Sequence, residues 1–100
     1  MSNKNNYRLS DLAKQDIQSI FEYTIENWGE KQARVYALKL SDGFDLIAQS
    51  PKVGTSRNKL YPNALSYIVG SHIIFYAINS DSNIEIARVL HQSMDFERHF

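Results

Sequence analysis

The sequence predicts an α+β fold in which an N-terminal strand and an antiparallel helix hairpin pack on a small, mostly antiparallel sheet. Three observations support this prediction. Apolar residues recur at helical spacing through the first half of the chain. Their pattern becomes strand-like after residue 65, and Gly or Pro residues separate the segments. A chain of 100 residues has the size of one domain, so we expect residues 1–100 to form a single domain.

The first predicted elements are a short edge strand and a helix over residues 11–27. Ser10 and Asp11 are typical of a helix start, because a side-chain oxygen can accept a hydrogen bond from an otherwise unpaired backbone N–H. The positions that follow at helical spacing share one face of the helix: Ala13, Ile17, Ile20, Phe21, Thr24 and Trp28.

A second helix is predicted after Gly29, which lacks a Cβ atom and therefore suits a left-handed backbone just past a helix end. Its apolar positions are Ala33, Tyr36, Ala37, Leu40, Phe44, Ile47 and Ala48. Pro51 prevents much continuation, and the short connection predicts an antiparallel hairpin. Gly43, inside the second helix, indicates either close packing or a position without steric demand.

An irregular connection over residues 51–65 leads to the strands, predicted at residues 65–69, 72–78 and 84–90. Gly70-Ser71 suits a two-residue hairpin turn, and residues 79–83 are a cluster of turn formers. The last two strands are apolar on both faces. We therefore expect the helix hairpin to cover one face of the sheet, and the tail over residues 94–100 or a partner to cover the other.

Composition excludes several classes of protein. Eleven basic and eleven acidic residues cancel, so the chain lacks the positive excess typical of proteins that bind nucleic acid directly. The absence of cysteine excludes disulfides and Cys-based zinc sites, and the three histidines lack metal-ligand spacing, so we expect no metal and no cofactor. Residues 1–6 lack the apolar stretch of a signal peptide, and no run is long enough to span a membrane. We expect a cytoplasmic protein.

A local excess of positive charge occurs in the predicted connection. Residues 46–80 contain Lys52, Arg57 and Lys59 and no acidic residue. Aromatic residues are not interleaved with these cations, so the connection is a poor platform for stacking single-stranded nucleic acid. It is either a solvated loop or a surface that docks on an acidic partner.

Arg88 is unusual because it stands among apolar residues of the third predicted strand. Strict alternation places its side chain on the same face as Ile86 and Leu90. An arginine in this position either holds a phosphate or pairs with a carboxylate such as Asp95 or Glu97 and fixes the tail. We expect the pairing with a carboxylate.

His91 follows that strand and has two interpretations. Its ring either takes part in acid–base catalysis beside Arg88 or caps backbone groups at the end of the strand, and we expect the cap. The aromatic residues at helical or strand spacing are expected to pack in the core or in the hairpin seam: Tyr7, Tyr23, Trp28 and Tyr36.

The order of these elements resembles the ParE branch of the RelE/ParE toxin superfamily. The resemblance covers nearly the whole chain and is carried by five segments: Phe21–Thr24, Asn27–Ala33, Ser50–Gly54, Arg88–His91 and Met94-Asp95. It implies a toxin of a toxin–antitoxin pair that a ParD-like antitoxin holds inactive. It also implies that the released toxin inhibits DNA gyrase and so blocks replication.

A protein of this kind acts by binding other proteins, so we expect no catalytic residue. The candidate partner-binding residues are Arg57, Lys59, Arg88, His91, Met94 and Asp95. Two alternatives stay open, a RelE-like endonuclease that cuts mRNA on the ribosome and a chain that only binds its antitoxin. The first requires a general base, a general acid and clustered cations, for which this sequence offers few candidates.

Overall fold

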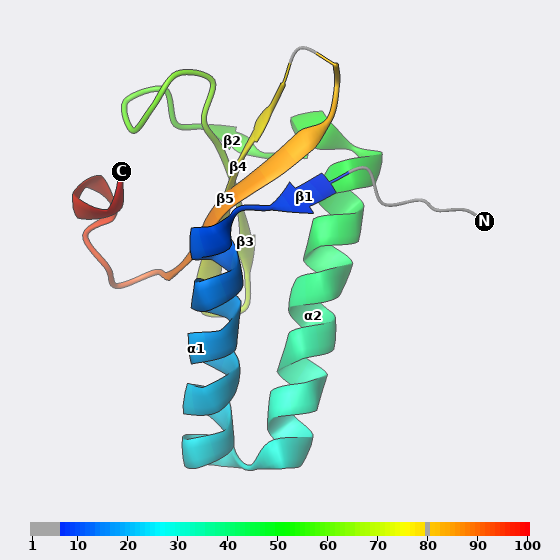
Figure 1. Ribbon diagram of the computed structural model, residues 1–100, viewed down its shortest axis with the longest axis vertical. Helices are drawn as coiled ribbons and strands as arrows, with labels where there is room; N and C mark the ends of the chain where they lie inside the picture. Colours follow the sequence, from blue (N-terminus) through cyan, green and yellow to red (C-terminus); the bar gives the residue numbers. More distant parts are fainter. Residues whose placement is uncertain (1–6, 80) are drawn as a thin grey trace.

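A pair of long helices lies across one face of a five-stranded sheet in the computed structural model, which describes residues 7–79 and 81–100 (Figure 1). The predicted α+β fold is confirmed. The polar start at residues 1–6, and Ser80 within the predicted turn, lie outside the described residues.

The strands are β1 (Tyr7–Leu9), β2 (Thr55–Ser56), β3 (Leu65–Val69), β4 (His72–Ile78) and β5 (Ile84–His91). They are arranged in the order β1-β5-β4-β3-β2. β1 pairs parallel with β5, and the other neighbours pair antiparallel. Gly70 and Ser71 form the predicted two-residue turn, and Gly70 has a φ angle of +57°. Strand β2 was predicted only as irregular chain.

The helix hairpin consists of α1 (Asp11–Trp28) and α2 (Glu30–Gln49), as predicted. Ser10 caps α1, because its Oγ accepts a hydrogen bond from the Ala13 amide at 3.0 Å. The same Oγ donates to the carbonyl of Ala87 at 2.7 Å, which ties the helix start to β5. Gly29 joins the helices at φ 93° and ψ 165°, a conformation that glycine alone adopts readily. In the described part of the chain, no helix is long and apolar enough to cross a membrane.

The main core lies between the hairpin and the sheet. Its buried residues include Leu40, Phe44 and Ile47 from α2 and Ile74, Tyr76, Ile84 and Ile86 from the sheet. Gly43 permits the close approach of these layers, because a Cβ atom there would lie 2.7 Å from Cγ2 of Val69. Of the two interpretations of Gly43, close packing is therefore the correct one.

A second buried cluster lies on the other face of the sheet, where Ile73, Phe75 and Leu90 pack with Leu60 and Phe96. The tail contributes through the 3-10 helix η2 (Phe96–His99) and through Phe100. The rings of Phe96 and Phe100 each lie 5.1 Å from the Phe75 ring, measured between centroids. The tail thus covers part of this face, which was one of the two expectations; the other was a partner protein.

A β-bulge in β5 overturns the predicted alternation. Phe75 pairs with Arg88, but the next residue of β4, Tyr76, pairs with Ile86, so the ladder has no partner for Ala87. Ile86 consequently joins the core under the helices, whereas Leu90 joins the cluster on the other face. The prediction that Ile86 shares a face with Arg88 and Leu90 is wrong, because strict alternation assumes an unbroken ladder.

Candidate functional site

Four of the six candidate residues lie around one groove of about 630 Å³. Arg57 and Lys59 stand on the connection that precedes β3, and Met94 and Asp95 stand on the segment that follows β5. The other residues that line the groove are Ser56, Asn58, Leu60, Phe96 and Glu97. The structure therefore brings together two short segments that are far apart in the sequence.

The connection that carries the basic wall of the groove is fixed to the sheet by partly buried polar contacts. Tyr76 Oη donates to the carbonyl of Pro51 at 2.7 Å and accepts from the Gly54 amide at 3.0 Å. Burial raises the pKa of Tyr76 above its ordinary value, so the hydroxyl stays protonated and keeps its donor. Further along the connection, Nε of Arg57 donates to Oγ of Ser66 at 2.9 Å. These contacts fix the path of the connection and the side chain of Arg57.

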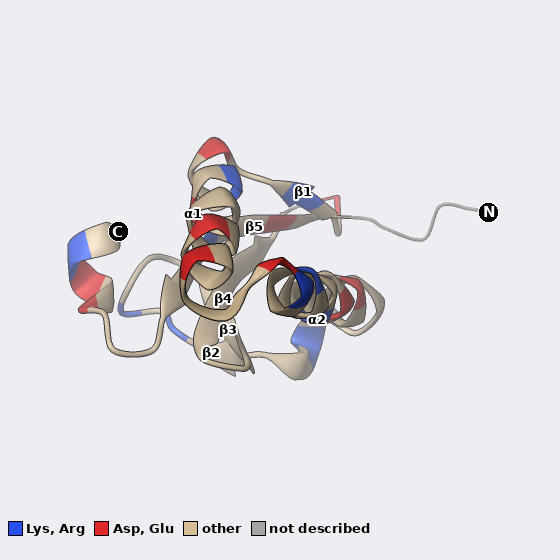
Figure 2. Cartoon of the chain, turned by 90° about the horizontal axis from the view of Figure 1, so that it is seen from below, with Lys and Arg blue, Asp and Glu red and all other residues tan. Residues whose placement is uncertain are grey.

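The opposite wall is acidic, because Asp95 and Glu97 lie on the tail that packs against Phe75 (Figure 2). Cations and carboxylates thus face the same groove. A phosphate backbone entering it would meet both signs of charge, whereas a protein segment with charges of both signs could be matched on both walls.

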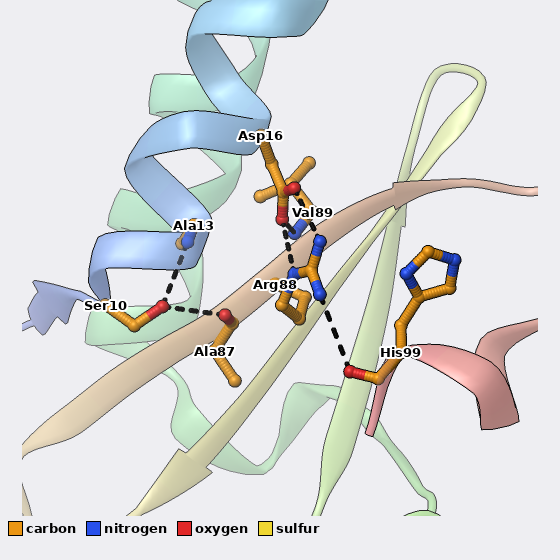
Figure 3. Close-up of polar contacts among 7 residues, drawn as sticks. All are labelled: Ser10, Ala13, Asp16, Ala87, Arg88, Val89 and His99. Atoms are coloured by element: carbon orange, nitrogen blue, oxygen red, sulfur yellow. Dashed lines mark hydrogen bonds and ion pairs between the residues drawn. The ribbon is translucent and has the colours of Figure 1, made fainter.

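Arg88 lies outside this groove and is paired with Asp16 of α1 (Figure 3). Its Nε and Nη2 atoms each lie 2.8 Å from a carboxylate oxygen of Asp16. The carboxylate also accepts the backbone N–H of Val89 at 3.0 Å. Only 15% of the arginine side chain and 13% of the aspartate side chain are exposed. The hydrogen bond to Asp16 raises the pKa of Arg88 further.

The carboxylate predicted for Arg88 was the wrong one. Asp95 and Glu97 lie along the groove, and Asp16, 72 residues away in the sequence, takes their place. The expected link to the tail exists in another form, because Nη1 of Arg88 donates to the carbonyl of His99 at 3.5 Å. Arg88 therefore joins α1, β5 and the tail, and its forked donor pair is already occupied by a carboxylate.

His91 caps the end of β5, as expected. Its Nδ1 accepts the backbone N–H of Ser93 at 3.1 Å and lies 2.9 Å from the Ser93 hydroxyl. The strand includes His91, one residue beyond the predicted end. His91 also pairs across the ladder with His72, and the two ring centroids are 5.3 Å apart. Among the described residues, no group of three His, Cys, Asp or Glu side chains could hold a metal.

A second cleft, of about 520 Å³, lies between the helix hairpin and the β3–β4 turn. It is lined by Tyr23, Thr24, Trp28, Gln32, Tyr36, Ser71, His72 and His91. Tyr36 and Tyr7 are partly buried against the core, as predicted. The packing prediction is wrong for Tyr23 and Trp28, which are 63% and 71% exposed.

The exposure of these two residues has a structural reason. Trp28 ends α1 at the tip of the hairpin, where the helices extend past the sheet (Figure 1). Tyr23 is three residues from Ile20, but at 100° per residue it lies about 80° from the centre of the buried face that passes through Ile20 and Thr24. That angle could be calculated from the sequence, whereas the length by which the hairpin exceeds the sheet could not.

Tyr36 holds the β3–β4 turn against α2. Its hydroxyl accepts the Ser71 amide at 3.0 Å and lies 2.7 Å from Nδ1 of His72. Burial, together with the neighbouring His91, lowers the pKa of His72 to about 4. His72 is therefore neutral at pH 7.

The lowered pKa of His72 predicts an acid-sensitive fold. The unfolded chain binds a proton at His72 near pH 6.5, whereas the folded chain binds it only near pH 4. The contribution of neutral His72 to the free energy of unfolding is therefore fully present above pH 6.5 and is lost as pH falls from about 6.5 to 4. Urea unfolding at several pH values should show that the free energy of unfolding falls less steeply with decreasing pH for His72→Gln than for the parent. His99→Gln serves as the control and should keep the parent's slope. Equal slopes for the parent and His72→Gln would contradict the prediction.

Comparison with known proteins identifies the family. Residues 7–96 match the family model described as the ParE toxin of the type II toxin–antitoxin system parDE. The chain is 39% identical over 93 residues to the toxin ParE1 of Caulobacter vibrioides, covering 93% of this chain and 95% of that protein. It is 34% identical over 92 residues to the toxin ParE1 of Mycobacterium tuberculosis, covering 92% and 94% respectively.

A solved structure agrees with the fold. A chain of the chromosomal ParDE system from P. aeruginosa superposes with a TM-score of 0.75 at 14% identity, covering 90% of this chain and 98% of that one. The family match runs from β1 to Phe96 and includes the Asp16–Arg88 pair, the second cleft and every lining residue of the groove except Glu97. The chain belongs to the ParE toxins of type II toxin–antitoxin systems.

Proposed function

We propose that this toxin is held inactive in the cytoplasm by a ParD-like antitoxin and that, once released, it inhibits DNA gyrase by binding and without turnover. The observation that carries the proposal is the family match over residues 7–96. The name of the P. aeruginosa structure, a ParDE system, describes that protein as part of such a pair.

Three features of the structure support binding over catalysis. The guanidinium of Arg88 is occupied by Asp16, so its forked donor pair is not open to a phosphate. Nδ1 of His91 accepts a backbone N–H, which commits this nitrogen to a structural contact. The groove beside Arg57 also carries Asp95, whose charge opposes the approach of RNA.

Exposed apolar residues support a protein partner. On the hairpin alone these are Leu12, Tyr23, Ile25, Trp28, Val35, Leu38 and Leu46. They lie on both helices of the hairpin, and contiguous exposed apolar side chains are typical of surfaces that another protein covers. An antitoxin segment that folds on binding could bury several of them at once.

The proposal is tested by two assays with the purified chain, gyrase supercoiling and cell-free translation. We expect inhibition of supercoiling, intact mRNA, and recovery of supercoiling when the antitoxin encoded beside this chain is added. Cleaved mRNA would instead support the RelE-like alternative, and no effect in either assay would support a chain that only binds its antitoxin.

A matched pair of variants tests the groove. Lys59→Glu reverses a charge on the groove wall and should weaken inhibition of supercoiling by about tenfold, the size of a lost charge contact at an interface. Lys14→Glu, on the exposed side of α1, should leave inhibition unchanged. Equal inhibition by the parent and both variants would remove the groove from the binding surface.

A further inference from the structure

The outer face of α2 carries an apolar stripe that nothing in the described chain covers. Val35 is 52% exposed, Leu38 is 66% exposed, and Leu46 is also exposed. At 100° per residue these three positions fall within an arc of about 80°. The arc lies opposite Leu40 and Phe44, which face the core, so the stripe points away from the rest of the molecule.

The charges of α2 are segregated along its length. The first half carries Lys31, Arg34 and Lys39, and its one acidic residue, Glu30, pairs with Arg34 at 3.2 Å. The second half carries only acidic residues, Asp42 and Asp45. Asp42 lies at the centre of the arc, between Leu38 and Leu46, and Lys39 falls about 60° from that centre.

We propose that two copies of this chain associate through the outer faces of α2, packed antiparallel about a twofold axis. A twofold axis brings the basic half of each helix against the acidic half of its partner. It also sets the two helix dipoles antiparallel, which is their favourable arrangement. The surface is therefore complementary to itself in both charge and apolarity.

One register satisfies both kinds of contact. Placing Val35 opposite Leu46 of the second copy puts the symmetry axis between Leu40 and Ser41. The same axis places Lys39 opposite Asp42 of the second copy, because the two pairs share this midpoint in the sequence. The two Leu38 side chains then lie close to the axis. The coincidence of the apolar pair and the charge pair in one register favours a second copy as the occupant.

The association should be weak and reversible. A single pair of helices covers less surface than the roughly 1,200–2,000 Å² of a standard stable interface. We therefore expect a dimer whose population rises with concentration in the micromolar range, detected by sedimentation velocity of the purified chain between about 1 and 200 µM.

Charge reversal identifies the register. Lys39→Asp and Asp42→Lys should each raise the dissociation constant by about tenfold or more, since the twofold axis repeats each substitution and creates two like-charge contacts. The double variant exchanges the two charges and should restore dimerisation to near the parent level. Such a rescue would show that the single variants weaken the dimer through this charge contact and not through a loss of folding. Circular dichroism monitors the folding of each variant.

Leu38→Glu should give a monomer throughout this concentration range, and Ile68→Glu, at an exposed apolar position of β3, should leave the dimer intact. A parent chain that stays monomeric at the highest concentration would overturn the proposal. So would a dimer that survives Leu38→Glu, or a double charge variant as weak as the single ones. If Leu38 is shielded from solvent only when the antitoxin is bound, the stripe belongs to the interface with that partner instead.

Discussion

Replacing Asp16 with alanine should lower the free energy of unfolding by about 3–5 kcal/mol, the cost of removing one member of a buried ion pair. The substitution leaves the guanidinium of Arg88 in a site where its side chain is only 15% exposed. It also removes the acceptor of the Val89 N–H. Urea denaturation, followed by circular dichroism, measures the change.

A double variant separates the effect of the unpaired charge on Arg88 from the effect of lost packing. In a double variant, Asp16→Ala with Arg88→Met, the unpaired charge is gone, so part of the stability should return. Glu26→Ala, on the exposed face of the same helix, should change stability by less than about 0.5 kcal/mol. A result for Asp16→Ala within this smaller range would show that the ion pair contributes nothing to the fold.

The main elements of the fold could be predicted from local sequence. The helices follow from the spacing of their apolar residues, and Gly29 and Gly70 mark turns because both adopt positive φ angles. Strand β2 could not be predicted, because two exposed residues form a strand only through their pairing with β3. The bulge at Ala87 likewise could not be predicted, because it is visible only in how β5 pairs with β4.

The candidate site was predictable only where its residues are close in sequence. Arg57 and Lys59 were found as one group, and Met94 and Asp95 as another, but their meeting at one groove depends on the tail packing against Phe75. That Arg88 would pair with a carboxylate followed from its apolar surroundings. Which carboxylate it pairs with depends on how α1 crosses β5, and local sequence does not encode this crossing.

Replacing Phe75 with alanine should also lower the free energy of unfolding by about 3–5 kcal/mol, the usual cost of deleting a large buried aromatic side chain. Phe75 is fully buried. Its ring contacts Phe96 and Phe100, so the same substitution should release the tail from the sheet. Thermal or urea unfolding measures the first effect, and faster cleavage by trypsin after Arg98 measures the second.

Phe96→Ala separates these two effects. Phe96 is only partly buried, so its loss should cost less stability than the loss of Phe75, yet it removes one of the two aromatic contacts between tail and sheet. If the tail is held through Phe75, both variants should expose Arg98 to trypsin while only Phe75→Ala unfolds at much lower urea. Because Asp95 reaches the groove through this tail, both variants should also weaken inhibition of gyrase. A tail that stays protected in both variants would mean that other contacts hold it, such as the hydrogen bond from Arg88 to the carbonyl of His99 or the packing of Phe100 on Tyr61.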